Sequence, residues 1–214
     1  MILDGFLPLA MRSSNDCGPT AMLQALRHSG VDIDYDELLR VWRFRRGADR
    51  TDTPGHHLRA LGRLGVAFSI RRRLGRGRIA RALQAGRPVV MLVPTGVLRW
   101  HWIVACGVEH GRLMVSRGDG GTAGIRWDDL SKVARARPEG RALRVDGLGY
   151  SLGRPAPFET DVALERDLVR LARIAEGTLG PCEPLARLLP SPSGAPGNGL
   201  CSNKDAPACR GAGA

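Results

Sequence analysis

The stretch Asn15-Asp-Cys-Gly-Pro-Thr-Ala21 places a cysteine at the point where a loop becomes a helix. Pro19 suits the first turn of a helix, because the N–H that proline lacks would have no partner there. Apolar residues then recur at helical spacing, and Gly30 is placed to end the helix. Free N–H groups and the helix dipole stabilise a thiolate at such a position. Cys17 is therefore a candidate nucleophile, and a buried structural thiol is the alternative.

Helical patterns fill the first half of the chain, and strand patterns follow them. Two further helices are predicted, one after a capping box at Asp34 and Glu37 and one that starts at Pro54. From Val66 onward, short apolar runs between turn residues indicate strands, with a hairpin turn at 109–111. Helices followed by a mostly antiparallel sheet predict an α+β fold. The predicted strands are 66–70, 88–93, 100–108, 112–116, 123–127 and 142–148, with a small helix at 79–83.

His101 is the candidate base, because a thiol nucleophile needs a group that takes its proton and later returns it. It begins the apolar run His101-Trp-Ile-Val-Ala-Cys-Gly107, where an imidazole is costly unless it is hydrogen-bonded or used. A satisfied core histidine is the alternative. Cys106 in the same run is predicted to be a small core residue. The other histidines lie near predicted helix ends or in a turn and are expected to be exposed: His28, His56, His57 and His110.

The composition argues against several classes of function. No CxxC, HxxxH or HExxH spacing is present, so we expect no metal and no cofactor. The formal net charge is +11, but nearly all basic residues are arginine and aromatic residues make up only 5%. We therefore expect a solvated basic surface rather than nucleic-acid binding. The arginine cluster at 71–81 could still attract an acidic partner.

Domain organisation follows from shifts in composition along the 214 residues. One domain is expected at 1–150, a linker with an amphipathic helix at 151–178, and a disordered low-complexity tail at 179–214. The helix is predicted at about 160–176 and is expected to pack on the domain. No run of about eighteen apolar residues and no signal peptide are readable. A soluble cytoplasmic protein with reduced thiols is therefore expected.

Three stretches together resemble a known family. They are the segment around Cys17 at a helix start, the strand Gly86-Arg-Pro-Val-Val-Met-Leu92, and the run from His101 to Val108 with its hairpin partner. The resemblance is to the bacteriocin-processing, double-glycine-leader cysteine peptidases, and it covers roughly residues 5–148. It implies a papain-like fold and cleavage after a small-residue pair such as Gly-Gly. Cys17 would carry the thiolate and His101 would act as the base.

The first departure from the family is Met11. Members of the family have a glutamine six residues before the nucleophile, where it donates to the oxyanion, and a thioether cannot donate. Asn15, with the backbone N–H of Cys17, is the substitute that chemistry suggests. Losing one oxyanion donor costs about 3 kcal/mol, so a slow enzyme is expected if nothing replaces it.

The second departure concerns the group that orients the histidine. Similar proteins place an aspartate after the strand that follows the histidine strand, and here Arg117 stands about at that position. Asp119 comes two residues later, and a bulge at Gly118 could bring its carboxylate to His101. The alternative for Asp119 is a plain turn residue, and Ser116 is a weaker alternative as the orienting group.

The main functional hypothesis is a cysteine peptidase with Cys-His-Asp acyl-enzyme chemistry that acts on a peptide precursor, such as one with a leader peptide. Neither a GxxxxGK[ST] phosphate loop nor a spanning helix is readable, so in leader processing the exporter would be either separately encoded or absent. Met11 and the displaced acidic residue motivate one alternative, a non-catalytic domain that binds peptides. A Cys-His amidase or acyltransferase is a further alternative, because it uses the same two residues.

Overall fold

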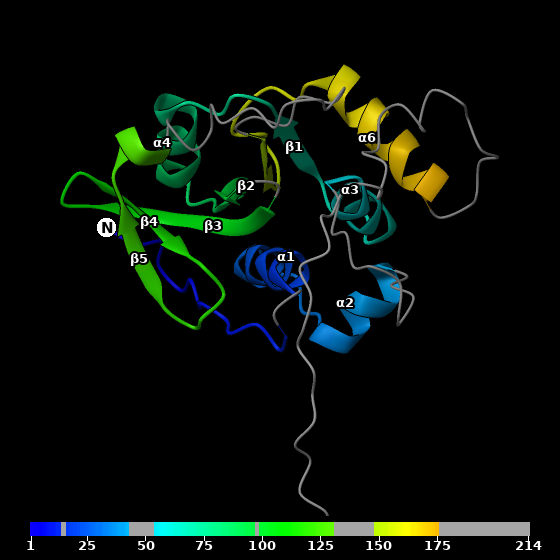
Figure 1. The fold of residues 1–214 in the computed structure, drawn as a ribbon, viewed down its shortest axis with the longest axis horizontal. Coiled ribbons are helices and arrows are strands. Elements are labelled where there is room, and N and C mark those ends of the chain that lie inside the picture. The colour runs from blue at the N-terminus through cyan, green and yellow to red at the C-terminus, as the bar shows by residue number, and fades with distance from the viewer. Residues whose placement is uncertain (14–15, 43–53, 97–98, 131–147, 176–214) are drawn as a thin grey trace, which may run out of the picture.

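The computed structural model describes residues 1–13, 16–42, 54–96, 99–130 and 148–175. The first part of the chain is helical and most of the strands come later, in one antiparallel sheet (Figure 1), so the predicted α+β class is confirmed. The elements in chain order are α1 (Cys17–His28), α2 (Tyr35–Trp42), α3 (Pro54–Arg63), β1 (Phe68–Arg71), α4 (Arg76–Gln84), β2 (Val89–Gly96), β3 (Arg99–Glu109), β4 (Arg112–Ser116), β5 (Thr122–Ile125), β6 (Gly149–Leu152) and α6 (Val162–Ala175).

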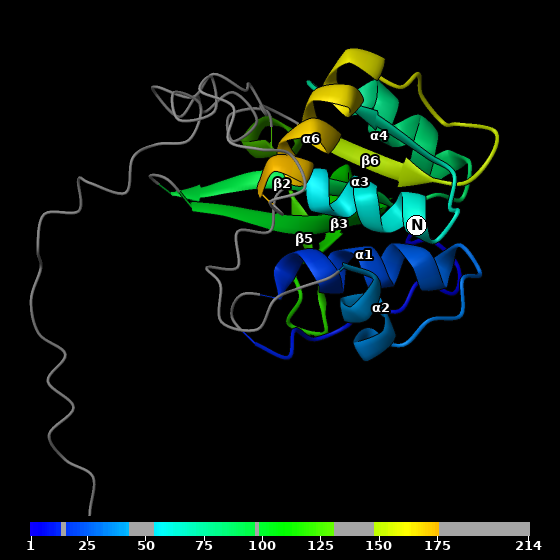
Figure 2. The same ribbon diagram turned by 90° about the vertical axis from the view of Figure 1, so that its right-hand side faces the viewer.

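The six strands form one sheet in the order β1-β6-β2-β3-β4-β5, and each neighbouring pair is antiparallel. Figure 2 shows α1 and α4 on opposite sides of this sheet. The central strands β2 and β3 are therefore covered on both faces, which explains their nearly continuous apolar runs. Of the last predicted strand, 142–148, all but residue 148 lies outside the described residues, and β6 begins directly after this range, at Gly149.

Helix α1 is the central helix of the fold. Every residue from Gly18 to Leu26 is buried, because the sheet covers one side of the helix and α2 and α3 contact it elsewhere. Gly30, at φ 79°, follows the helix end as predicted. The second predicted helix is also capped as expected, since the Glu37 N–H donates to Asp34 Oδ1 at 2.7 Å.

Residues 1–3 complete the sheet beside β3. Strand β2 pairs with β3 only as far as Val89 opposite Ala105, which leaves the next residues of β3 without a strand on that side. The Leu3 N–H donates to the Cys106 carbonyl at 2.7 Å, and the Val108 N–H donates to the Met1 carbonyl at 2.9 Å. The N-terminal segment therefore belongs to the sheet.

Gly107 permits this close approach. A Cβ at Gly107 would lie 2.5 Å from the carbonyl oxygen of Met1 and 2.6 Å from the Cα of Ile2. Both atoms belong to the backbone, so neither can yield by a simple change of rotamer. Only glycine fits at this position without displacing the N-terminal segment.

The expectation that His57 is exposed was wrong. Its side chain is fully buried, and its Nδ1 lies 2.8 Å from the Tyr150 hydroxyl. Its ring also stacks on Trp102 with a centroid separation of 3.9 Å and meets Trp42 edge-on. These aromatic rings and the hydroxyl offset the cost of burying an imidazole. His110 is exposed as predicted, whereas His28 and His56 are half-buried.

Helix α6 packs on α3, with Leu164 and Leu168 buried in the common core. Asp161 caps it, because the Leu164 N–H donates to Asp161 Oδ1 at 3.1 Å. Strand β6 extends to Leu152, just past the boundary expected at residue 150. The tail at 179–214 lies outside the described residues, so the division of the chain stays a prediction. No helix within the described ranges is long and apolar enough to cross a membrane.

Substitution of Gly107 by alanine should destabilise the protein. The added methyl group would overlap backbone atoms of residues 1 and 2, so we expect a loss of about 1–3 kcal/mol in the free energy of unfolding, measured in urea. Gly124→Ala is the matched control, because a Cβ there would meet side-chain atoms and no backbone: Cδ of Arg112 at 3.2 Å and Sδ of Met114 at 3.5 Å. Equal stabilities of the two variants would contradict this account of Gly107.

Candidate active site

Cys17 is the first residue of α1 and is half-buried, whereas the residues that follow it are buried. The Thr20 N–H donates to the Asp16 carbonyl at 3.0 Å, so the hydrogen-bonded turns begin with Asp16 and Cys17 lies in the first of them. The positive end of the helix dipole therefore acts on the Cys17 sulfur. The sequence predicted this placement of Cys17, the candidate nucleophile, at a helix start.

His101 lies near the start of β3, opposite Val93 of β2, and its side chain is half-buried. Helix α1 packs against β3, and Figure 2 shows the N-terminal end of α1 on the same side of the molecule as the start of β3. The packing of one helix on one strand therefore brings both candidate residues to one end of the sheet.

The imidazole of His101 is held by a main-chain group. Its Nε2 lies 3.0 Å from the carbonyl oxygen of Arg117. A carbonyl oxygen only accepts hydrogen bonds, so Nε2 carries the hydrogen of the neutral ring and Nδ1 keeps a lone pair. The ring is thus held in the tautomer that can take a proton at Nδ1.

Asp119 lies in a turn, and its carboxylate is engaged locally. Its Oδ1 accepts the Gly121 N–H at 3.0 Å, and its Oδ2 lies 3.3 Å from Nη2 of Arg117. The Gly121 N–H, followed by Arg117, lowers the pKa of Asp119 below its ordinary value. These contacts favour the folded state at neutral pH and are lost as the pH falls through that pKa. No hydrogen bond joins Asp119 to His101 within the described residues.

The other proposed members of the site are placed less directly. Asn15 lies outside the described residues, so its role as an oxyanion donor stays a prediction. Ser116 is buried, and its hydroxyl has no hydrogen-bond partner in the part of the chain that the structure describes. Ser116 therefore does not hold the imidazole.

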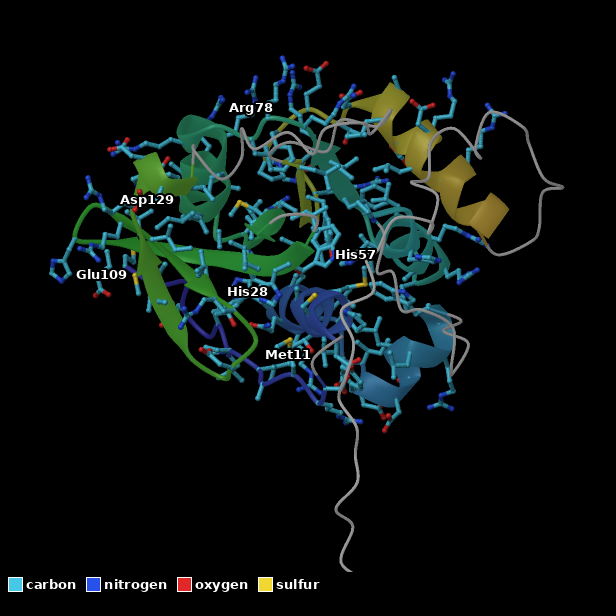
Figure 3. The ribbon with its side chains drawn as sticks, in the orientation of Figure 1. Met11, His28, His57, Arg78, Glu109 and Asp129 are labelled. Atoms are coloured by element: carbon cyan, nitrogen blue, oxygen red, sulfur yellow. The ribbon has the colours of Figure 1, made fainter. Side chains whose placement is uncertain are left out.

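Met11 contacts the turn that follows β4. The Met11 N–H donates to the Gly118 carbonyl at 2.7 Å, and Ala10 pairs with Asp119 in an antiparallel bridge. Figure 3 shows Met11 on the segment that leads into α1. This contact joins the chain just before Cys17 to the residue just after Arg117. The sequence pointed to Met11 only as a missing donor and carried no signal for this contact.

A buried acid beside Cys17 was also missed. Asp16 is only 8% exposed, and its carboxylate lies against the hydroxyl of Tyr35 at the start of α2. Burial and the Asp16 carboxylate both raise the pKa of Tyr35. The guanidinium of Arg12 lies 4.3 Å from the centre of the Tyr35 ring and pairs with Asp36 at 2.9 Å. Tyr35 after the capping residue Asp34 was the available signal, because an aromatic residue at a helix start favours burial against a neighbouring element.

Cys106 differs from Cys17 in its burial and in its position in the fold. It is fully buried on β3, as predicted, and its Sγ lies 3.5 Å from the Met114 carbonyl. Burial raises the pKa of the Cys106 thiol to about 11, so it remains protonated at neutral pH. Within the described ranges, no group of three or more His, Cys, Asp and Glu side chains is placed to hold a metal ion.

The fold is similar to those of two solved peptidase structures. One is the peptidase domain of Streptococcus ComA, a bifunctional ABC transporter involved in a quorum-sensing pathway, with a TM-score of 0.53 and 15% sequence identity over 69% of this chain and 98% of that domain. The other is a Bacillus anthracis protein described as a C39-like peptidase, with a TM-score of 0.50 and 11% identity over 72% of this chain and 96% of that one. No protein-family model and no curated protein matches the sequence. The chain therefore has the papain-like fold of C39 peptidase domains, as its resemblance to the family implied.

Cys17 should be the most reactive thiol of the protein. We expect iodoacetamide to modify it at about pH 7.5, because the helix N-terminus favours the thiolate and the proposed base His101 would favour it further. Cys106 should stay unmodified in the native protein, because it is fully buried and its pKa is about 11. Peptide mapping by mass spectrometry gives the rate at each cysteine, and Cys17→Ser should abolish the fast reaction. Cys182, in the segment 179–214 that the sequence predicts to be disordered, serves as the reference thiol, and a Cys17 that reacts no faster than Cys182 would show that the thiol is not activated.

Proposed function

We propose that this protein is a cysteine peptidase in which Cys17 is the nucleophile and His101 is the base. One observation carries the proposal. The helix that starts at Cys17 packs against the strand that holds His101, whose ring is fixed through Nε2 with Nδ1 left to take a proton. A thiol at a helix start and an oriented imidazole on the adjacent strand are the two groups that acyl transfer through a thioester needs.

The reaction would follow from these groups. The Cys17 thiol gives its proton to Nδ1 of His101, and the sulfur forms a bond to the carbonyl carbon of the scissile peptide. The tetrahedral intermediate collapses, the C–N bond breaks, and the imidazolium returns the proton to the leaving amine. Water then attacks the thioester, and His101 accepts a proton from that water. The C–S bond breaks, the carboxylic acid product departs, and the proton on His101 returns to the sulfur to regenerate the thiol.

Oxyanion stabilisation would come from the backbone N–H of Cys17 and from the side-chain amide of Asn15. Met11 cannot take this part, because its side chain has no hydrogen to donate. Asp119 remains a proposed orienting group only if its carboxylate leaves the contacts that it makes with Gly121 and Arg117. If Asn15 donates poorly to the oxyanion, turnover is low, since one missing oxyanion donor costs about a hundredfold. Poor orientation of His101 would lower turnover as well.

The proposed substrate is a peptide precursor with a leader that ends in two small residues, such as Gly-Gly. The family resemblance of the sequence supports this proposal, and so does the fold shared with the peptidase domain of an ABC transporter. A separately encoded exporter would then be the partner that carries the processed peptide. The proposed location is the cytoplasm, where a precursor would be cut before export.

Cleavage of a double-glycine precursor peptide tests the proposal directly. Mass spectrometry should find a new C-terminus after the second glycine, and both Cys17→Ala and His101→Gln should abolish the product. Arg112→Gln is the matched control, because Arg112 is exposed on β4 and takes no part in the proposed site. Cleavage that persists in Cys17→Ala would overturn the assignment of the nucleophile.

The same experiment separates the two other candidate functions. Met11 and the engaged carboxylate of Asp119 favour a domain that binds peptides without cutting them. Such a domain would bind the precursor with equal affinity in the native protein and in Cys17→Ala, and would release no product. An acyltransferase would join the N-terminal part of the peptide to an added amine, which changes the mass of the product by the mass of that amine minus water.

A further inference from the structure

We propose that Met11 and Gly118 form a positioning pair that holds the imidazole of His101 through the main-chain carbonyl of Arg117. The structural part of this inference stands on the contacts of these four residues. Its consequence for catalysis rests on the proposed peptidase function. Neither Met11 nor Gly118 touches a reacting atom in this scheme, and both act through the carbonyl that fixes the ring.

The fit between Met11 and Gly118 is close. Gly118 has a φ of 84°, in the left-handed region that glycine adopts most easily. A Cβ there would lie 2.7 Å from Cγ of Met11 and 3.2 Å from its Sδ. The Met11 side chain therefore fills the space that a side chain at position 118 would need. The Met11 N–H also donates to the Gly118 carbonyl at 2.7 Å, so backbone and side chain hold the same residue.

The carbonyl that bonds His101 belongs to the peptide plane that joins Arg117 to Gly118. At its N-terminal end, this plane is held by the sheet, because the preceding residue Ser116 pairs with Val104 of β3 and with Thr122 of β5. On the other side it ends at the Cα of Gly118, which Met11 covers. With both ends fixed, the plane cannot rotate freely, and its oxygen stays 3.0 Å from Nε2 of His101.

The charged groups nearby do not take over this task. The Arg117 guanidinium points to Asp119, and that carboxylate is further held by the Gly121 N–H. A carbonyl orients the ring and selects its tautomer, but it adds no full negative charge beside the imidazolium. The Arg117 carbonyl therefore acts as an uncharged orienting group, and its position matters more than the charge at position 119.

The two departures from the family pattern are thus one structural unit. Position 11 lacks the expected amide donor, and position 117 lacks the expected carboxylate. The structure joins the two positions through Gly118, so the apolar side chain at 11 supports the main-chain group that replaces the carboxylate. A methionine suits this contact, because its unbranched thioether adapts to an irregular gap.

The tautomer of His101 is the readout that tests this inference. In full-length protein labelled with ¹⁵N-histidine, two-bond ¹H–¹⁵N correlation spectra at neutral pH should show hydrogen on Nε2 of His101. Met11→Ala should populate the other tautomer or broaden these signals, because the peptide plane loses its support. Met11→Leu, which keeps an apolar side chain of similar size, should restore the native pattern. These spectra need no peptidase activity, so a failure of the proposed function would not obscure the result.

Two controls make the assignment specific. Met114→Ala removes a half-buried methionine from β4 and should leave the His101 signals unchanged. Asp119→Asn should also leave them unchanged, because the carboxylate makes no hydrogen bond to the ring in the described residues. Gly118→Ala provides a second perturbation of the same plane and should shift the signals in the same direction as Met11→Ala.

Where cleavage is measurable, Met11→Ala should lower kcat by about ten- to a hundredfold and leave KM nearly unchanged, since misplacing a catalytic group affects the chemical step. The inference is overturned if Met11→Ala keeps the native His101 signals. It is also overturned if Asp119→Asn shifts them as far as Met11→Ala does, which would return the orienting role to the carboxylate.

Discussion

The packing of α1 against β3 is the constraint on which the rest of the structure depends. Ala21 and Ala25 are buried in this helix, and their small side chains let a helix approach a sheet closely. Because α1 is covered over nearly its whole length, it can neither rotate nor slide without opening the core. The placement of Cys17 relative to His101 therefore depends on core packing, which would supply the rigidity that the proposed pair requires.

Two cysteines of the same chain show how environment decides chemical behaviour. Cys106 lies inside a strand, where burial disfavours its thiolate and makes it a small apolar residue. Cys17 lies half-buried at a helix start, where backbone dipoles favour negative charge. The buried acid Asp16 adjoins Cys17 in the chain, and its carboxylate lies against the hydroxyl of Tyr35.

Much of the fold was predictable, because local signals mark the ends of the elements. Pro19 and Pro54 mark the first turns of helices, and Gly30 marks the end of one. The change in the spacing of apolar residues after Val66 marks the start of the strands. The order of the strands was not predictable, since a short strand such as β6 has almost no pattern of its own. The burial of His57 was missed for a related reason: its partners Trp42, Trp102 and Tyr150 come from three distant elements.

Sequence patterns point to candidate side chains but not to main-chain groups. Cys17 and His101 are candidates from residue type and local context, and their chemical roles stay predictions. The carbonyl of Arg117 could not be found in this way, because every residue has one and only the tertiary structure shows which one meets the imidazole. Asp119 was an expectation based on the position of an aspartate in the family and on a possible bulge at Gly118, and in the structure its carboxylate accepts the Gly121 N–H of the turn.

The position of β6 between β1 and β2 determines when the sheet can assemble during synthesis of the chain. During synthesis the chain emerges from its N-terminus, yet the sheet stays in two parts until residues 149–152 are available to join them. The first three residues likewise find their partners only after residues 106–108 have been made. Contacts of such long sequence separation slow folding, and until they form, the open edges of β1 and β2 can pair with other chains. A nascent chain of this protein is therefore most exposed to aggregation shortly before β6 leaves the ribosome, which is when a chaperone would protect it best.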